Sequence, residues 1–153
     1  MIVYRVSSGE YETRLWNGNG GLNFDGRWNT KGHRIVYTSE CLALAVLENL
    51  VNIGRFSRFG KYFKARAEIP DKFIIEINEL LLMKNRWNDP EIGHETQEIG
   101  DHWLKEKTSA VLRVPSAVLN SECDFLLNPE HPDFGKLHLY PAEPLEIDPR
   151  LCV

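Results

Sequence analysis

The chain has 153 residues, of which 42% are hydrophobic and 26% charged, and a formal net charge of −4. This length suits one domain with a proper core, so we expect a single domain over residues 1–153. The acidic balance argues against direct DNA binding, because a general nucleic-acid binder needs a basic footprint to displace counterions from phosphates. The three cysteines stand at unrelated spacings and do not form a disulfide framework pattern.

Targeting and metal-binding signals are not found in the sequence. No apolar stretch approaches the length that spans a membrane, and the N-terminus lacks the basic and apolar regions of a signal peptide. We therefore expect a cytoplasmic protein without a membrane partner. The five histidines show no HExxH or Cys-pair spacing, so no metal is expected.

The chain is predicted to open with a short strand over residues 2–6, in which Arg5 stands among apolar residues. Arg5 is either an edge residue that faces water or a phosphate ligand at the mouth of a pocket. A glycine-rich polar loop follows over residues 17–29. Glycines allow such a loop to approach a phosphate closely, but the loop matches neither the Walker pattern nor the dinucleotide fingerprint.

A strand at residues 34–38 is followed by a helix from Cys41 to about Ile53, with Ser39 as the expected N-cap. The helix is apolar nearly all round, which predicts a buried helix. Glu48 is the exception, because a carboxylate among apolar turns is costly unless something pairs with it. It is either a rim residue paired with a Lys or Arg, or a functional carboxylate beside small residues that leave room for a ligand.

Residues 55–66 interleave basic and aromatic residues. Such a segment can stack on unpaired bases, which keeps an RNA-directed protein as one alternative. Over residues 62–69, however, one set of mostly apolar side chains alternates with a mostly polar set, which explains much of this segment as a half-exposed strand. Pro70 and Asp71 then turn the chain into a strand over residues 73–77, which predicts a hairpin, and residues 80–83 form a short helix or turn.

A second helix is expected at residues 95–107, although Gly100 lowers the helix propensity in its middle. A strand over residues 109–115 ends at Pro115. Ser116 follows as an ordinary turn hydroxyl or as one that faces a cleft. Further strand-like pieces lie at residues 124–127, 137–140 and 145–147. Short strands outnumber helices and do not alternate with them, so we predict an α+β fold with a curved, mostly antiparallel sheet and a few helices.

Several uncommon strings stand in a fixed order along almost the whole chain. They are YRV at residues 4–6, GRWN at 26–29, VYTSE at 36–40, LALAVLE at 42–48, TQEIGDHWL at 96–104, LRVPSA at 112–117, FLLNPEHPDF at 125–134 and DPRL at 148–151. Together they resemble the RES domain family, which is named for an arginine, a glutamate and a serine.

The resemblance implies an ADP-ribosyltransferase-like fold and a toxin of a bacterial toxin–antitoxin pair that consumes NAD⁺ as its substrate. Its partner would be an antitoxin with an Xre-like helix-turn-helix region. The ADP-ribose acceptor would be water, phosphate or a protein, so glycohydrolase, phosphorylase and ADP-ribosyltransferase activities all stay open. A homodimer is a further partner expectation, and a non-enzymatic interaction module stays an alternative.

On the family pattern Arg27 matches the motif arginine, Tyr37 the strand tyrosine, Glu48 the helix glutamate and Ser116 the serine. Breaking the nicotinamide–ribose bond develops positive charge on the ribose, which Glu48 would stabilise. Arg27 would hold the pyrophosphate through its planar fork of donors. Tyr37 would stack on the nicotinamide, and Ser116 would hydrogen-bond its ribose or amide.

Two further residues are candidates for the binding site. Arg5 would contact a phosphate, and Asn128, in the LLNP turn, would support the site from behind. The resemblance as a whole requires that Glu48 and Arg27 meet across one dinucleotide-sized cavity.

Overall fold

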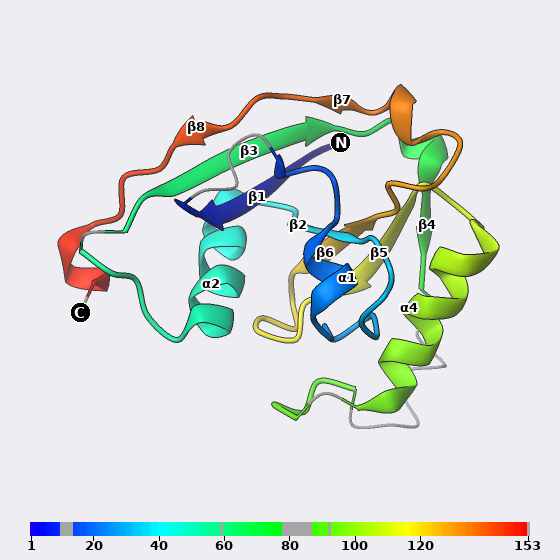
Figure 1. Cartoon of the computed structure of the whole chain (residues 1–153), viewed down its shortest axis with the longest axis horizontal. Coiled ribbons are helices and arrows are strands. Elements are labelled where there is room, and N and C mark those ends of the chain that lie inside the picture. The colour runs from blue at the N-terminus through cyan, green and yellow to red at the C-terminus, as the bar shows by residue number, and fades with distance from the viewer. Residues whose placement is uncertain (10–13, 59, 78–86, 92, 153) are drawn as a thin grey trace.

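The computed structural model describes residues 1–9, 14–58, 60–77, 87–91 and 93–152. Its described strands form one curled sheet (Figure 1). They are β1 Ile2–Ser8, β2 Val36–Ser39, β3 Tyr62–Glu68, β4 Ile74–Glu76, β5 Val111–Pro115, β6 Cys123–Leu127, β7 His138–Leu139 and β8 Glu143–Pro144. The described α-helices are α1 Gly20–Asn23, α2 Leu42–Ile53 and α4 His94–Glu106, and short 3-10 turns cover Asp71–Phe73, Phe134–Lys136 and Pro149–Leu151.

The strand order is β4-β5-β6-β2-β1-β3-β7, with β8 also paired to β3. Every pairing between these strands is antiparallel except that of β4 with β5. The expected α+β class with a curved, mostly antiparallel sheet is therefore confirmed.

The hairpin expected around Pro70 does not form. The 3-10 turn Asp71–Phe73 carries the chain away from β3, and β4 pairs in parallel with β5 at the far end of the sheet order. The strand expected at residues 145–147 is also wrong, since the chain pairs with β3 slightly earlier, through β8. The predicted helix or turn at residues 80–83 lies outside the described residues.

The strand expected at residues 62–69 is confirmed as β3, and its side chains alternate as predicted around Ala65, Ala67 and Arg66. Tyr62 is the exception, because it is buried rather than exposed. Its ring meets Phe56 edge to face at 4.9 Å, and its hydroxyl accepts a hydrogen bond from the Ser57 N–H at 2.8 Å. The Tyr62 ring can therefore be buried while its hydroxyl keeps a hydrogen-bond partner, although the alternation of β3 predicts that this residue faces solvent.

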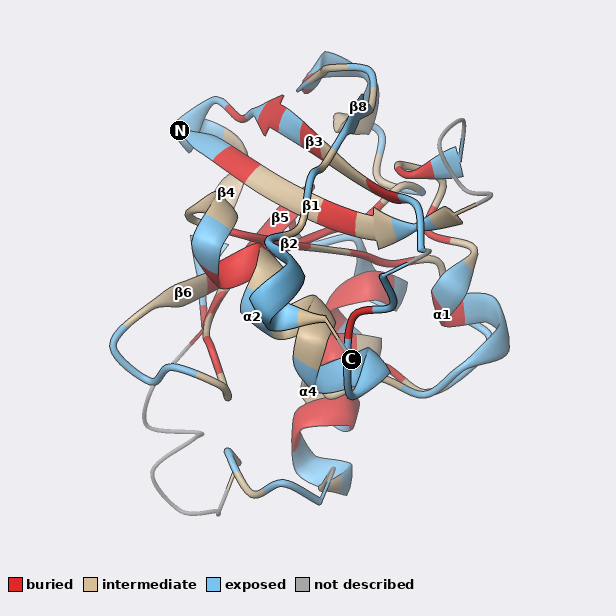
Figure 2. Cartoon of the chain, turned by 90° about the vertical axis from the view of Figure 1, so that its left-hand side faces the viewer, coloured by how far each residue is buried: buried red, intermediate tan, exposed pale blue. Residues whose placement is uncertain are grey.

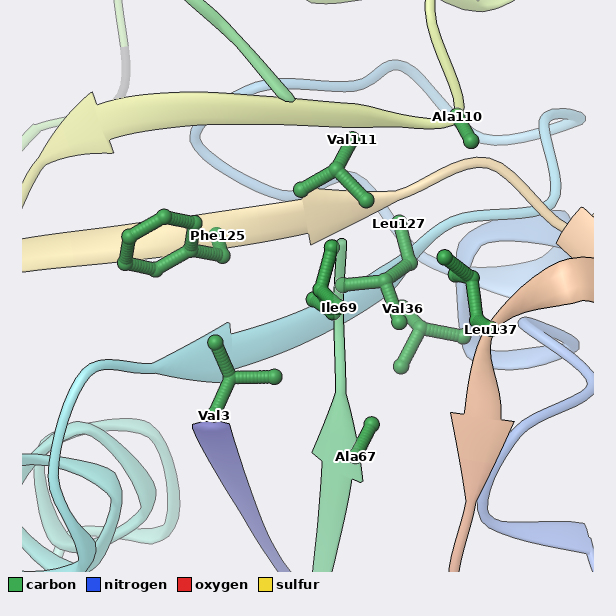
Figure 3. Packing of buried hydrophobic residues seen from close by; sticks show 9 residues of the cluster. All are labelled: Val3, Val36, Ala67, Ile69, Ala110, Val111, Phe125, Leu127 and Leu137. Carbon is green, nitrogen blue, oxygen red and sulfur yellow. The ribbon is translucent and has the colours of Figure 1, made fainter. Parts of the chain in front are cut away.

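The core lies on both faces of β5 and β6, because successive residues of a strand point to opposite faces. One cluster contains Val111 and Leu127, together with residues of β1, β2 and β3 that converge in Figure 3. The second contains Leu112 and Leu126, which pack with Trp103 of α4. The registers Val111↔Leu127 and Leu112↔Leu126 keep each pair on one face.

The helix α2 begins one residue later than expected, and it is not buried. Cys41 is the N-cap, and its sulfur accepts a hydrogen bond from the Leu44 N–H at 3.4 Å, whereas the expected cap, Ser39, belongs to β2. Leu44 is buried, but Leu47 is 37% and Val51 62% exposed. The helix packs against β1 and β2 with one side only, and its outer side is exposed or half-buried in Figure 2. The apolar residues on every side of α2 therefore did not mean that the helix is buried on every side.

The helix expected at residues 95–107 is confirmed as α4, and the structure explains the glycine in its middle. A Cβ on Gly100 would lie 1.7 Å from the Trp28 carbonyl oxygen. Glycine is the residue that lets the two backbones come this close. No helix in the described part of the chain is long and apolar enough to cross a membrane.

Candidate active site

A cavity opens where β1 and β2 separate. β1 pairs with β3 along its whole length, from Ile2↔Glu68 to Ser8↔Tyr62, but it pairs with β2 only at Tyr4↔Ser39. Beyond Tyr4 the two strands diverge and leave a cavity of about 320 Å³ beside α2, within the size range of small-molecule pockets, roughly 300–1,000 Å³. The cavity is lined by Tyr4, Arg5, Val6, Ser7, Ser8, Tyr37, Ser39, Ala45, Glu48, Asn49, Asn52 and Asp124.

Arg5 crosses the gap between the two strands. Its Nη1 donates a hydrogen bond of 2.8 Å to the Tyr37 carbonyl oxygen, in the region where the ladder between β1 and β2 has ended. The Arg5 Nε is buried and has no partner among the described residues. Burial lowers the pKa of Arg5 to about 10, so the guanidinium stays charged at neutral pH. Because β1 lies inside the sheet, Arg5 is not an edge residue, and it is one of the residues that line the cavity.

Glu48 lies on the side of α2 that faces the cavity. Its Oε1 accepts a hydrogen bond of 2.6 Å from the Ser116 hydroxyl. Within the described part of the chain, Glu48 takes part in no ion pair with a Lys or Arg. The structure therefore does not support the alternative of a rim carboxylate paired with a surface cation.

Ser116 supports Glu48 from behind and does not itself line the cavity. It is 0% exposed, and its Oγ accepts hydrogen bonds from the backbone N–H groups of Val118 at 3.1 Å and Leu119 at 3.0 Å. The N–H of Ser116 donates to the Glu122 carbonyl at 2.9 Å, which closes the turn after β5 and directs the hydroxyl inward. The expected cleft-facing hydroxyl is thus a buried group that contacts the carboxylate.

Tyr37 lines the cavity with its hydroxyl already occupied. The hydroxyl donates to the Asn29 Oδ1 at 2.7 Å and accepts from the Trp28 N–H at 3.1 Å, and burial raises its pKa. A Cβ on Gly26 would lie 2.5 Å from this oxygen, so a glycine is required where the loop closes over it. With the hydroxyl held in this way, the aromatic ring is the part of Tyr37 that remains for a ligand.

Arg27 and Asn128 are not among the residues that line the cavity, so the expected meeting of Glu48 and Arg27 across one cavity is not seen. The two terminal nitrogens of Arg27 donate to the carbonyl oxygens of Trp87 and Asp89, each at 2.6 Å. Asn128 is 1% exposed and donates from Nδ2 to the Leu104 carbonyl at 3.1 Å, which ties the turn after β6 to α4. Of the residues singled out in the sequence, the structure brings Arg5, Tyr37 and Glu48 to one cavity with Ser116 behind them.

Asp124 and Ser39 are cavity residues that the sequence analysis did not identify. Ser39 of β2 faces Asp124 of β6, and its hydroxyl donates to the Asp124 Oδ1 at 2.6 Å. Burial, together with the charge of the Glu48 carboxylate, raises the pKa of Asp124 to about 8. The sequence contained an indication of this role, because Asp124 is the only charged residue of the otherwise apolar stretch CDFLL at residues 123–127.

The described residues contain no group of three or more His, Cys, Asp or Glu side chains placed to hold a metal ion. The site consists instead of one guanidinium, two neighbouring carboxyl groups and an aromatic ring around a cavity in a divided sheet. With this arrangement the protein falls into the class of small α+β proteins with an ADP-ribosyltransferase-like fold.

Comparisons with known proteins identify the family within this class. The RES domain model matches residues 2–148, and the chain belongs to the RES domain family. It is 35% identical over 158 residues to "Toxin Res" of Yersinia enterocolitica, with 99% of each chain covered. It is 29% identical over 144 residues to the "Prs ADP-ribosylating toxin" of a Sphingobium species, with 92% of this chain and 89% of the relative covered.

A solved structure shares the fold. The chain is similar to one in the crystal structure of the M. tuberculosis MbcT–MbcA toxin–antitoxin complex, with a TM-score of 0.72 and 14% sequence identity. The similarity covers 94% of this chain and 83% of the other.

Proposed function

We propose that this protein is a bacterial toxin that cleaves the nicotinamide–ribose bond of NAD⁺, as a glycohydrolase or a phosphorylase, and so depletes cellular NAD⁺. The observation that carries the proposal is that a cation and a carboxylate, the half-buried side chains of Arg5 and Glu48, line one cavity. The fold and the relatives called toxins point in the same direction.

The proposed chemistry follows from the carboxylate. When nicotinamide leaves with the electron pair of the C–N bond, positive charge develops on the ribose ring. A fixed carboxylate beside that ring stabilises the charge without having to reorganise during the reaction. Glu48 meets this requirement because the Ser116 hydroxyl holds its Oε1 at 2.6 Å. Water or phosphate then attacks the ribose carbon from which nicotinamide has departed.

The substrate phosphates require a cation, and Arg5 is the cation that the described residues contribute to the cavity lining. Its charged guanidinium suits a pyrophosphate, since guanidinium–phosphate hydrogen bonds are charge-assisted. Arg27 can take the pyrophosphate role expected of it only after it releases the carbonyls of Trp87 and Asp89. We assign the phosphate contact to Arg5 and the stacking contact to the ring of Tyr37.

The direct test is to incubate the purified protein with NAD⁺, with and without phosphate, and to identify the products by mass. Release of nicotinamide is expected, with ADP-ribose or its phosphorylated form as the second product. Glu48→Gln keeps the shape of the side chain and removes its charge, so we expect a rate loss of about 10²–10³-fold. A melting temperature close to that of the unchanged protein would show that the loss is chemical. No nicotinamide release from the unchanged protein would overturn the proposal.

A second candidate reaction is transfer of ADP-ribose to a protein. It is favoured by the Sphingobium relative, which is called an ADP-ribosylating toxin. Incubation with biotin-labelled NAD⁺ and a bacterial extract separates the two reactions. A labelled protein band that needs intact Glu48 supports transfer, whereas free ADP-ribose without a labelled band supports cleavage.

The proposed partner is an antitoxin with an Xre-like helix-turn-helix region. The similar M. tuberculosis chain was solved in a toxin–antitoxin complex, which supports a partner of this kind. Gel filtration with and without the product of the neighbouring gene tests it, and the elution volume of the protein alone reports whether it forms a homodimer. Failure of the two proteins to co-elute would contradict the partner assignment.

A further inference from the structure

The outer side of α2 is apolar along its whole length, yet it is exposed or half-buried (Figure 2). A helix that is apolar on every side is ordinarily buried, and an exposed apolar surface on a folded domain marks an interaction site. We propose that this side of α2 is the interface of a homodimer, in which α2 of one chain packs antiparallel against α2 of a second copy. The inference goes beyond the proposed function and does not depend on it.

The apolar residues on the outer side have the spacing of a helix–helix interface. They are Ala43, Val46, Leu47, Leu50 and Ile53. Apart from Leu47, they follow one another at intervals of three, four and three residues, as apolar residues do along the contact line of two packed helices. Leu47 is 37% and Ile53 41% exposed, so much of this surface is open to a partner.

The cavity lies on the opposite side of the same helix. The α2 residues that line it are Ala45, Glu48, Asn49 and Asn52, and Glu48 is the only charged residue of α2. Leu50 stands two residues after Glu48, which is about 200° around the helix axis. A partner on the outer side therefore leaves the cavity open. An antitoxin that blocks the reaction directly has to cover the cavity, so the outer side suits a second copy of this chain better.

The charged residues near the two ends of α2 have opposite signs. At the start of the helix the Glu40 Oε1 accepts a hydrogen bond of 3.0 Å from the Cys123 N–H, which places Glu40 close to the chain at Glu122. Just after the helix, Arg55 and Arg58 are exposed.

This distribution of charge selects the antiparallel arrangement. A two-fold axis across the middle of α2 places the acidic end of each helix beside the basic end of the other, and it sets the two helix dipoles in opposite directions. A parallel pair would bring like charges together at both ends. The surface is thus complementary to itself in charge as well as apolar, which identifies the occupant as a second copy.

Sedimentation equilibrium of the full chain over a wide range of concentration tests the proposal. The weight-average mass should rise from the 17.7 kDa of one chain towards twice that value. Two helices of 12 residues form a small interface, so we expect a dissociation constant that is roughly micromolar or weaker.

Leu47→Glu places a negative charge in the middle turn of each α2, where the two chains meet at the axis. It should weaken the dimer by about tenfold or more, because like charges are brought together in an apolar contact. Ile75→Glu is the matched control. Ile75 is also 37% exposed, but it lies on β4 at the end of the sheet order, so the same added charge should leave the association unchanged. Melting temperatures of both variants confirm that they are folded.

A charge exchange tests the direction of the helices. Arg55→Glu and Glu122→Arg should each weaken the dimer by several-fold, because each places like charges together at both ends of the interface. The double variant restores the attraction with its sign reversed and should bring the dissociation constant back to within about threefold of the unchanged protein. A double variant weaker than either single variant would overturn the antiparallel arrangement.

Three further results would overturn the proposal. One is a mass of 17.7 kDa at every concentration. Another is a Leu47→Glu variant that associates as the unchanged protein does. The third is a chain that is monomeric alone but loses co-elution with the product of the neighbouring gene when Leu47 is changed to Glu, which would place the antitoxin on this surface. A dimer that behaves as expected but releases no nicotinamide from NAD⁺ would disprove the proposed function alone.

Discussion

Ser116 connects Glu48 to the backbone of the turn after β5. Replacing it with alanine removes the donor to Glu48 and leaves the N–H groups of Val118 and Leu119 without their acceptor. We expect Ser116→Ala to lower the free energy of unfolding by about 1–3 kcal/mol and the rate of NAD⁺ cleavage by about tenfold or more. Thermal melting and steady-state kinetics measure the two effects.

Ser121→Ala is the matched control, because Ser121 is exposed in the same turn and does not line the cavity. It should change neither quantity appreciably. An active, fully stable Ser116→Ala would mean that Glu48 is held by its other neighbours.

The guanidinium of Arg5 lines the cavity, whereas that of Arg27 is bonded to two backbone carbonyls. We therefore expect Arg5 to act in NAD⁺ binding and Arg27 in stability. Arg5→Lys keeps the charge but loses the planar fork, so we expect NAD⁺ binding to weaken by about tenfold. Arg27→Lys loses at least one of the two hydrogen bonds to the Trp87 and Asp89 carbonyls and should mainly lower the melting temperature. Calorimetric titration of NAD⁺ into the Glu48→Gln background measures the affinities without turnover.

A larger loss of affinity in Arg27→Lys than in Arg5→Lys would reverse this assignment. It would mean that Arg27 leaves the two carbonyls and reaches the pyrophosphate, as the family pattern implies.

Gly100 of α4 leaves room for the Trp28 carbonyl of the loop before β2. Gly100→Ala would place a Cβ 1.7 Å from that oxygen, so the helix or the loop that carries Trp28 must shift. Overpacking of this kind lowers the free energy of unfolding by about 1–3 kcal/mol. Denaturant unfolding should detect this loss, even though alanine has the higher helix propensity.

Gly135→Ala serves as the control for Gly100→Ala, because no heavy atom lies within 4 Å of a Cβ at Gly135. It should leave stability nearly unchanged. A stable Gly100→Ala variant would show that the loop before β2 can move away from α4, and with it the residues that hold the Tyr37 hydroxyl.

The elements also show which local expectations the sequence supports. Periodicity predicted α2, α4 and β3 within one or two residues, because helix and strand patterns depend on neighbours along the chain. The burial of α2 was not predictable in this way. Val51 and Leu44 are both apolar, and only the position of the sheet decides that Leu44 is covered while Val51 is exposed.

At the scale of the whole molecule, the two core clusters share β5 and β6. Val111 and Leu127 belong to one cluster and Leu112 and Leu126 to the other, so neither cluster can open without disturbing the same two strands. We predict a single cooperative unfolding transition for residues 1–153. For this length the calorimetric enthalpy should be about 100 kcal/mol near 60 °C.

Differential scanning calorimetry tests the single-domain prediction through the ratio of the calorimetric to the van't Hoff enthalpy. A ratio near one is expected for a two-state unit. Two separate transitions would show that the clusters unfold independently and that the chain contains two domains.

The order of residues along the chain was enough to predict the fold class, most helix and strand positions, the family resemblance and Glu48 as a carboxylate out of place among apolar residues. Three features appear only in the folded chain: β1 pairs with β2 only at Tyr4↔Ser39, Arg5 lines the cavity with Glu48, and Asp124 lines it too. The physical reason is the range of the interactions. Helix and strand patterns arise between near neighbours, whereas the order of the strands and the meeting of Glu48 with Asp124 depend on pairings between distant segments, which only the folded sheet fixes.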